Sequence, residues 1–233
     1  QYRLGVALLK AGRFDPAVFA FQALKTNYPK SKYLTESQYY LAVTYFKKRD
    51  WASTVDVAEA FVKSVSTSNE FAPEARYILA LSYFNLRQFD KAVPVFLEIL
   101  KLYPNEKAMA QNAQVGLAKT YYEMGELKEA LPRFKDVVLR YPKTQSQLEA
   151  LLWLGEHGLS TGDYQTAADH YIQALTDMPD SNKKGLIHFE LGRAYQGLEQ
   201  LDKALEHFRQ VDAQADALLY PKAKLAIAAI FAK

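Results

Sequence analysis

The sequence predicts an all-α solenoid of about six helix pairs with one further helix at its C-terminal end. Residues 79–104 show the repeating unit, because apolar residues recur there at helical spacing in two successive stretches. The first stretch ends at a polar turn, Arg87-Gln88, and the second ends before Pro104, which lacks an amide hydrogen and disfavours helix in the preceding residue. Neither helix could bury its apolar stripe alone, so each pair needs neighbouring pairs.

A leucine followed by a small residue recurs six times, at intervals of 37 or 38 residues. These positions are Leu4-Gly5, Leu41-Ala42, Leu79-Ala80, Leu117-Ala118, Leu154-Gly155 and Leu191-Gly192. Alanine thirteen residues after the leucine and an aromatic residue seventeen after it each recur in five of the six units. Unrelated helices would not keep this register, so the chain is an array of repeats.

This pattern resembles the tetratricopeptide repeat (TPR), whose usual period is about 34 residues. The resemblance covers nearly the whole chain and implies a right-handed superhelix of paired helices. Units end in Tyr-Pro at Tyr28-Pro29, Tyr103-Pro104 and Tyr141-Pro142. Long repeats that close in this way are similar to bacterial envelope TPR proteins, such as the Tol–Pal accessory protein and the TPR lipoprotein of the outer-membrane assembly machine. The second unit departs from the pattern, with Thr54 and Ala58 in place of alanine and an aromatic residue.

We expect one continuous TPR solenoid over residues 1–233, with units at about 1–30, 31–69, 70–105, 106–143, 144–180 and 181–216. The apolar stripes predict helices to residue 10 and over 14–27, 33–48, 51–65, 72–86, 89–102, 106–124, 127–140, 146–161, 164–176, 184–198, 201–213 and 218–232.

Three of the first helices are followed by a glycine. Gly12, Gly125 and Gly162 follow first helices where a left-handed residue is favoured, and Asp50 and Asp163 can cap the helices that come next. The chain opens inside a first helix and closes on an apolar helix, so we expect a fragment of a longer protein. The apolar helix at 218–232 could also associate with a second copy.

Composition limits the possible partners. The net charge of +3 is too small to indicate nucleic-acid binding, and the absence of cysteine excludes a disulfide framework and cysteine-ligated zinc. No apolar run approaches the ~20 residues of a membrane span.

The sequence shows no catalytic constellation. The four histidines, His157, His170, His188 and His207, form no His-Glu-x-x-His motif, and no glycine-rich phosphate loop is present. His170 and His207 share one repeat position, which favours a scaffold role; a metal site between His157 and His188 is the weaker alternative. We therefore predict a non-enzyme without cofactor or metal.

In the TPR family, first helices line the concave face, and the resemblance assigns a set of groove positions to this chain. These are Tyr39, Val43, Phe46, Lys47, Tyr77, Leu81, Phe84, Lys119 and Tyr122. Aromatic residues on such a surface suit an apolar or amphipathic peptide. We expect Phe46 and Phe84 to face the groove. For Tyr39 and Tyr77, exposure in the groove and packing between neighbouring helices fit the sequence equally well. The asparagines of the carboxylate-clamp TPR subclass are absent, with Val6 and Val43 in their places.

The sequence thus predicts a non-enzymatic scaffold that binds a protein or peptide segment in its concave groove, in a bacterial envelope assembly. Its expected location is periplasmic or outer-membrane-associated, with a cytoplasmic location as the alternative. The sequence also allows two alternative functions. The chain could be the regulatory or targeting TPR arm of a larger enzyme, or a cytosolic TPR adaptor.

Overall fold

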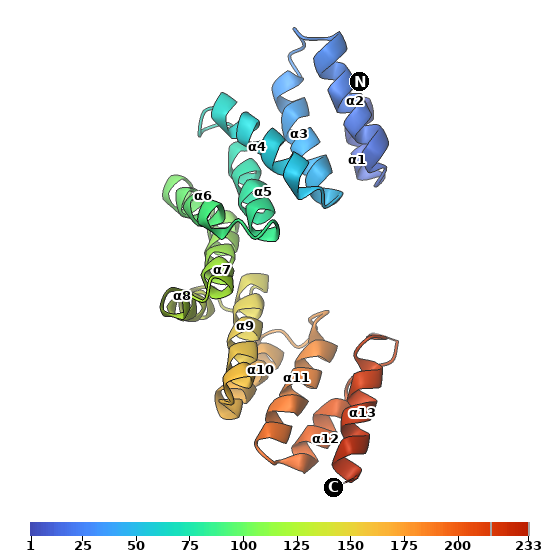
Figure 1. Ribbon diagram of the computed structural model, residues 1–233, viewed down its shortest axis with the longest axis vertical. Coiled ribbons are helices and arrows are strands. Elements are labelled where there is room, and N and C mark those ends of the chain that lie inside the picture. Colours follow the sequence, from blue (N-terminus) through green and yellow to red (C-terminus); the bar gives the residue numbers. More distant parts are fainter. Residues whose placement is uncertain (215, 233) are drawn as a thin grey trace. The chain divides into compact units, whose positions relative to one another are not determined.

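A computed structural model describes residues 1–214 and 216–232 of the chain. Within these residues there are thirteen helices and no strand, which confirms the all-α prediction (Figure 1). The helices are α1 (Tyr2–Lys10), α2 (Phe14–Asn27), α3 (Leu34–Lys47), α4 (Trp51–Ser64), α5 (Ala72–Asn85), α6 (Phe89–Leu102), α7 (Lys107–Glu123), α8 (Leu127–Arg140), α9 (Gln145–Thr161), α10 (Tyr164–Asp177), α11 (Lys184–Gly197), α12 (Leu201–Arg209) and α13 (Tyr220–Phe231).

The predicted bounds agree with the observed ones to within two residues, except at the end of α12. That helix was expected to reach residue 213 but ends at Arg209. Beyond it, the Asp212 carboxylate accepts a hydrogen bond from the Gln214 amide at 2.6 Å. Such a local bond from an aspartate to the backbone two residues on competes with helix, and the 3.6-residue apolar period does not reveal it.

The chain divides into two compact units, unit 1 (residues 1–130) and unit 2 (residues 131–233), with the boundary inside α8. In unit 1 the first helices pack on one another in sequence, since α1 contacts α3, α3 contacts α5 and α5 contacts α7. Each second helix, α2, α4 or α6, contacts the two first helices that flank it. The first helices therefore form one continuous layer. A single solenoid over residues 1–233 and its handedness stay predictions.

Each helix pair turns at a residue in the left-handed region, eight positions after the repeat leucine. These residues are Gly12, Gly125 and Gly162, and also Arg49, Arg87 and Glu199, with φ between 57° and 79°. After all of these residues except Gly162, the next amide donates to the carbonyl five residues back, as from Asp50 to Tyr45 at 3.0 Å and from Gln88 to Tyr83 at 2.9 Å. The predicted role of the three glycines is confirmed.

Buried aromatic rings of the second helices lie against glycines of the first helices. Phe21 meets Gly5, Tyr171 meets Gly155 and Phe208 meets Gly192, in each case within one repeat. Phe96 instead meets Gly116 in the following first helix. A Cβ atom would lie 2.4 Å from the Phe96 ring at Gly116, just before the repeat leucine, and 2.5 Å from the Tyr171 ring at Gly155, just after it, so glycine is what lets ring and backbone approach each other at both positions.

Candidate functional site

The predicted groove residues come from three adjacent first helices of unit 1, α3, α5 and α7, which form part of the continuous layer. Two of these residues lie in the core. Tyr39 is 6% exposed and stacks on Phe71 with ring centroids 4.5 Å apart, and Val43 is also buried. Burial, followed by the charge of Glu74, raises the pKa of Tyr39. A partner in the groove would not reach these two side chains.

Phe46 and Phe84 are half-buried, and each packs on the first residue of the next helix. The Phe46 ring meets Trp51 at 5.4 Å and the Phe84 ring meets Phe89 at 5.6 Å between centroids. These contacts brace the turn of each helix pair and leave part of each Phe46 and Phe84 ring accessible. The sequence analysis did not identify Trp51 and Phe89 as the residues that contact these rings. A signal existed, because an aromatic residue ten positions after the repeat leucine recurs in four of the six repeats.

The other predicted residues vary in exposure. Tyr77 is half-buried and packs edge-on against Phe96 at 6.3 Å, so it serves the contact with α6. Lys47 is exposed, and Leu81, Lys119 and Tyr122 are half-buried. The accessible remainder of the predicted site consists of Phe46, Lys47, Leu81, Phe84, Lys119 and Tyr122, which we call the first-helix face.

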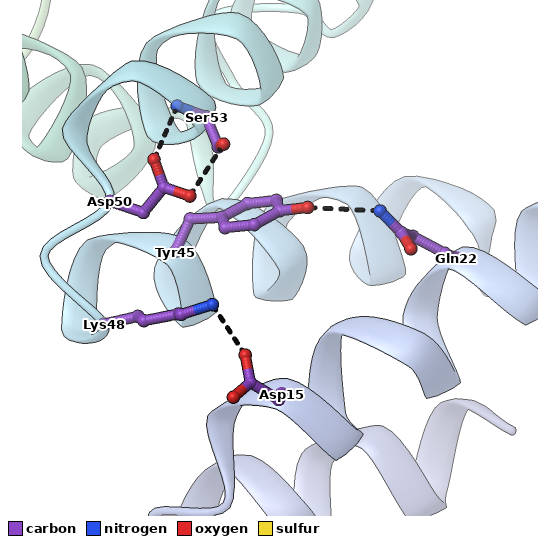
Figure 2. A network of polar contacts seen from close by, with 6 residues as sticks. All are labelled: Asp15, Gln22, Tyr45, Lys48, Asp50 and Ser53. Atoms are coloured by element: carbon purple, nitrogen blue, oxygen red, sulfur yellow. Dashed lines mark hydrogen bonds and ion pairs between the residues drawn. The ribbon is translucent and has the colours of Figure 1, made fainter.

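A groove that the sequence analysis did not identify lies between α2 and α4, with α3 as its floor. This α3 groove has a volume of about 890 Å³. Its lining residues are Phe21, Gln22, Lys25, Thr26, Leu34, Ser37, Gln38, Leu41, Tyr45, Asp56, Val57 and Ala60. The Gln22 amide on one wall donates to the Tyr45 hydroxyl on the floor at 3.1 Å (Figure 2).

Polar contacts fix the end of this groove (Figure 2). The Lys48 ammonium at the end of α3 bonds to the Asp15 carboxylate of α2 at 2.6 Å. Asp50 caps α4, since its carboxylate accepts from the Ser53 amide at 3.2 Å and from the Ser53 hydroxyl at 2.8 Å. The capping role predicted for Asp50 is confirmed.

The equivalent α5 groove, between α4 and α6, is smaller at about 470 Å³. Arg76 on its floor is 6% exposed, and its guanidinium bonds to Glu98 at 3.1 Å and to the Tyr103 hydroxyl at 3.2 Å. The Tyr83 hydroxyl donates to the Glu59 carboxylate, and this hydrogen bond lowers the pKa of Glu59. The chain's own side chains thus occupy the α5 groove.

Three matches with known families cover most of the chain. Residues 115–182 and 187–213 match two tetratricopeptide-repeat families, and residues 1–93 match YfiO, an outer membrane lipoprotein family. Residues 115–182 and 187–213 are therefore tetratricopeptide repeats by sequence. The predicted likeness to envelope TPR proteins is confirmed for residues 1–93. No curated protein matches the chain.

Solved TPR structures share the fold. The C-terminal part of a TPR protein from Cytophaga hutchinsonii is 13% identical, with a TM-score of 0.69 over 93% of this chain and 80% of that one. BtubC from P. vanneervenii is 15% identical, with a TM-score of 0.67 over 90% of each chain. MamA from Desulfovibrio magneticus is 20% identical, with a TM-score of 0.59 over 76% and 92%. These likenesses confirm the TPR solenoid fold.

The TPR scaffold pairs two histidines in unit 2. The Nδ1 atoms of His188 on α11 and His207 on α12 lie 3.0 Å apart, and the Tyr195 ring stacks on His207 at 5.4 Å. One imidazole must donate and the other accept, so at least one ring is neutral. Burial and then the charge of His207 lower the pKa of His188 to about 4, and burial lowers that of His207. The structure thus joins His188 to His207.

Stability of unit 2 should fall as the pH falls from 7 to 5. The folded pKa of His188 lies below its ordinary value of 6.5, so the unfolded chain binds more protons between pH 6.5 and about 4. Thermal melting across this range should show the decline, and His188→Asn should reduce its slope. His157→Asn, on the neighbouring first helix α9, is the matched control and should keep the slope. An unchanged slope in His188→Asn would mean that the histidine pair is not responsible.

The described residues, 1–214 and 216–232, contain no cluster of three or more potential metal ligands. None of their helices combines the length and the apolar character needed to cross a bilayer. The matched sequence families are repeat families and an outer membrane lipoprotein family, so none of them indicates a catalytic activity.

Proposed function

We propose that this TPR chain is a non-enzymatic scaffold of a bacterial envelope assembly, which binds a peptide or protein segment across its first-helix face. The match of residues 1–93 to an outer membrane lipoprotein family carries the proposal, because these residues include α3 and α5 of that face. The same match supports a periplasmic or outer-membrane-associated location. TPR proteins in general bind protein partners, which agrees with a role in assembly.

The structure suggests how the first-helix face would engage a partner. Phe46 and Phe84 stand at the same position of two adjacent repeats, and their rings pack on Trp51 and Phe89. Rings that are already fixed lose little side-chain entropy on binding, which favours their use as anchors. Lys47 beside Phe46 adds an exposed positive charge, which would favour a partner segment with an acidic residue near its apolar anchor.

A charge reversal at Lys47 should weaken partner binding without affecting the fold. In cells of the source organism, a photo-crosslinking residue at Leu81 should capture a partner protein in the envelope fraction, and Lys47→Glu should reduce the yield at least about threefold. Lys101→Glu, at an exposed position on α6, is the matched control and should have no effect. Recovery of the protein with the cytosol would contradict the location, and equal yields from both variants would contradict the use of this face.

The exposed side of α13 bears on the predicted self-association. Ala223 and Ile230 pack toward α12, whereas Leu225 and Phe231 are 70% and 68% exposed. These two side chains would form the apolar contact with a second copy. Self-association stays a prediction, and the proposed scaffold role does not depend on it.

A further inference from the structure

The α3 groove and the α5 groove occupy the same place in successive repeats. Leu41 and Tyr45 on the floor of the first correspond to Leu79 and Tyr83 on the floor of the second, and all four line their grooves. The walls also correspond, since α2 and α4 enclose the first groove and α4 and α6 enclose the second. A comparison of the two therefore shows what each groove contains at equivalent positions.

Among the positions at which the two linings differ, two hold an ion pair in the α5 groove that the α3 groove lacks. In the α5 groove, Arg76 stands three residues before the repeat leucine and bonds to Glu98, nineteen residues after it, at 3.1 Å. The equivalent residues of the α3 groove are Gln38 and Ala60. A shorter side chain and a missing carboxylate leave the α3 groove with about 890 Å³, against about 470 Å³ in the α5 groove.

The open groove is apolar at its centre and charged on its walls. Leu41 on the floor and Val57 on one wall are half-buried side chains that line the space. Lys25 on α2 and Asp56 on α4 are exposed, and neither forms an ion pair with another residue of the described part of the chain. Lys25 and Asp56 stand on equivalent helices of successive repeats, and their positions relative to the repeat leucine differ by six residues. Six residues correspond to about 9 Å along the helix direction.

The dimensions of the groove fit a short helix. Its floor residues extend from Leu34 to Tyr45, about 16 Å along α3 at 1.5 Å per residue, or about three helical turns. Charges of opposite sign on the two walls require a ligand that carries both signs. An amphipathic helix satisfies both conditions, with an apolar stripe toward Leu41 and Val57 and charged residues at its edges.

We propose that the α3 groove is a second docking surface, which binds an amphipathic helical segment of a protein partner. This segment presents an acidic side chain to Lys25 and a basic side chain to Asp56. The groove is formed between second helices and is distinct from the first-helix face, so the two surfaces can be tested separately.

Peptides selected on the protein test the proposal. A phage-displayed library of random 16-residue peptides is selected on the immobilised 233-residue chain, and the enriched sequences are synthesised with a fluorescent label. We expect enrichment of helical sequences with an apolar stripe and charges of both signs. In fluorescence anisotropy, Gln38→Arg combined with Ala60→Glu, which copies the filling of the α5 groove, should weaken binding at least tenfold. Lys47→Glu, on the first-helix face, should leave the affinity unchanged.

A charge exchange keeps the test decisive if the filled variant does not fold. Lys25 is exposed, so Lys25→Glu should not disturb the fold. It should weaken peptide binding at least threefold, and replacing the acidic residue of the peptide by lysine should restore the affinity. Enriched peptides that bind the filled variant as tightly as the original chain would overturn the proposal. It would also be overturned by a selection that enriches no peptide, or only peptides that lose affinity with Lys47→Glu.

Discussion

Replacing Phe96 by alanine should lower the free energy of unfolding by roughly 3–5 kcal/mol, the usual range for a buried phenylalanine truncated to alanine. The Phe96 side chain is 0% exposed and packs between Gly116 of α7 and Tyr77 of α5. Its ring therefore joins two successive first helices to the second helix between them. The cavity left by truncation cannot collapse easily, because helix backbone forms one of its walls.

Leu97→Ala is the matched control for this prediction. Leu97 is the next residue of α6 and is 43% exposed, so its truncation should cost less than about 1 kcal/mol. Denaturant unfolding of both variants, followed by circular dichroism at 222 nm, gives the two free energies. A similar loss in both would show that the orientation of α6 is wrong, because a rotated helix would bury Leu97 in place of Phe96.

The sequence could predict the helices and their turns because each is specified locally. An apolar stripe at helical spacing, a left-handed residue eight after the repeat leucine and a capping aspartate such as Asp50 act over a few residues, and the repeats present each signal several times. Repetition also allows Arg49, Arg87 and Glu199 to be assigned to the turn position held by glycine elsewhere.

The site was harder to predict, because exposure depends on residues of neighbouring helices. Tyr39 shares a first-helix position with the half-buried Tyr77, but Phe71 covers it, and Phe71 lies in the segment that leads into α5. The contact of His188 with His207 likewise joins two helices whose relative rotation the repeat pattern leaves open. For the α3 groove a signal did exist, since Gln38 and Ala60 replace the charged pair of the next repeat, but a periodicity analysis along single helices does not compare those positions.

Close packing between Gly155 and Tyr171 gives the last prediction, which concerns the small residue of the repeat. A Cβ atom at Gly155 would lie 2.5 Å from the Tyr171 ring, and Tyr171 is 1% exposed. Gly155→Ala should therefore lower the free energy of unfolding by about 1–3 kcal/mol through overpacking. Without that contact, alanine would stabilise the helix by about 1 kcal/mol relative to glycine. The sign of the effect thus reports whether the ring is in place.

The second repeat already carries the combination that should relieve this overpacking, with Ala42 at the position of Gly155 and Ala58 at the position of Tyr171. In a Tyr171→Ala background, Gly155→Ala should consequently become neutral or stabilising, even though Tyr171→Ala alone is strongly destabilising. A double-mutant cycle from denaturant unfolding should give a coupling of at least about 1 kcal/mol between the two sites. Additive losses would contradict the contact. A coupling of the expected sign would show that alanine at the small position and an aromatic ring packed on it are alternatives, which explains why Phe96, in a repeat with Ala80, turns to Gly116 of the next first helix.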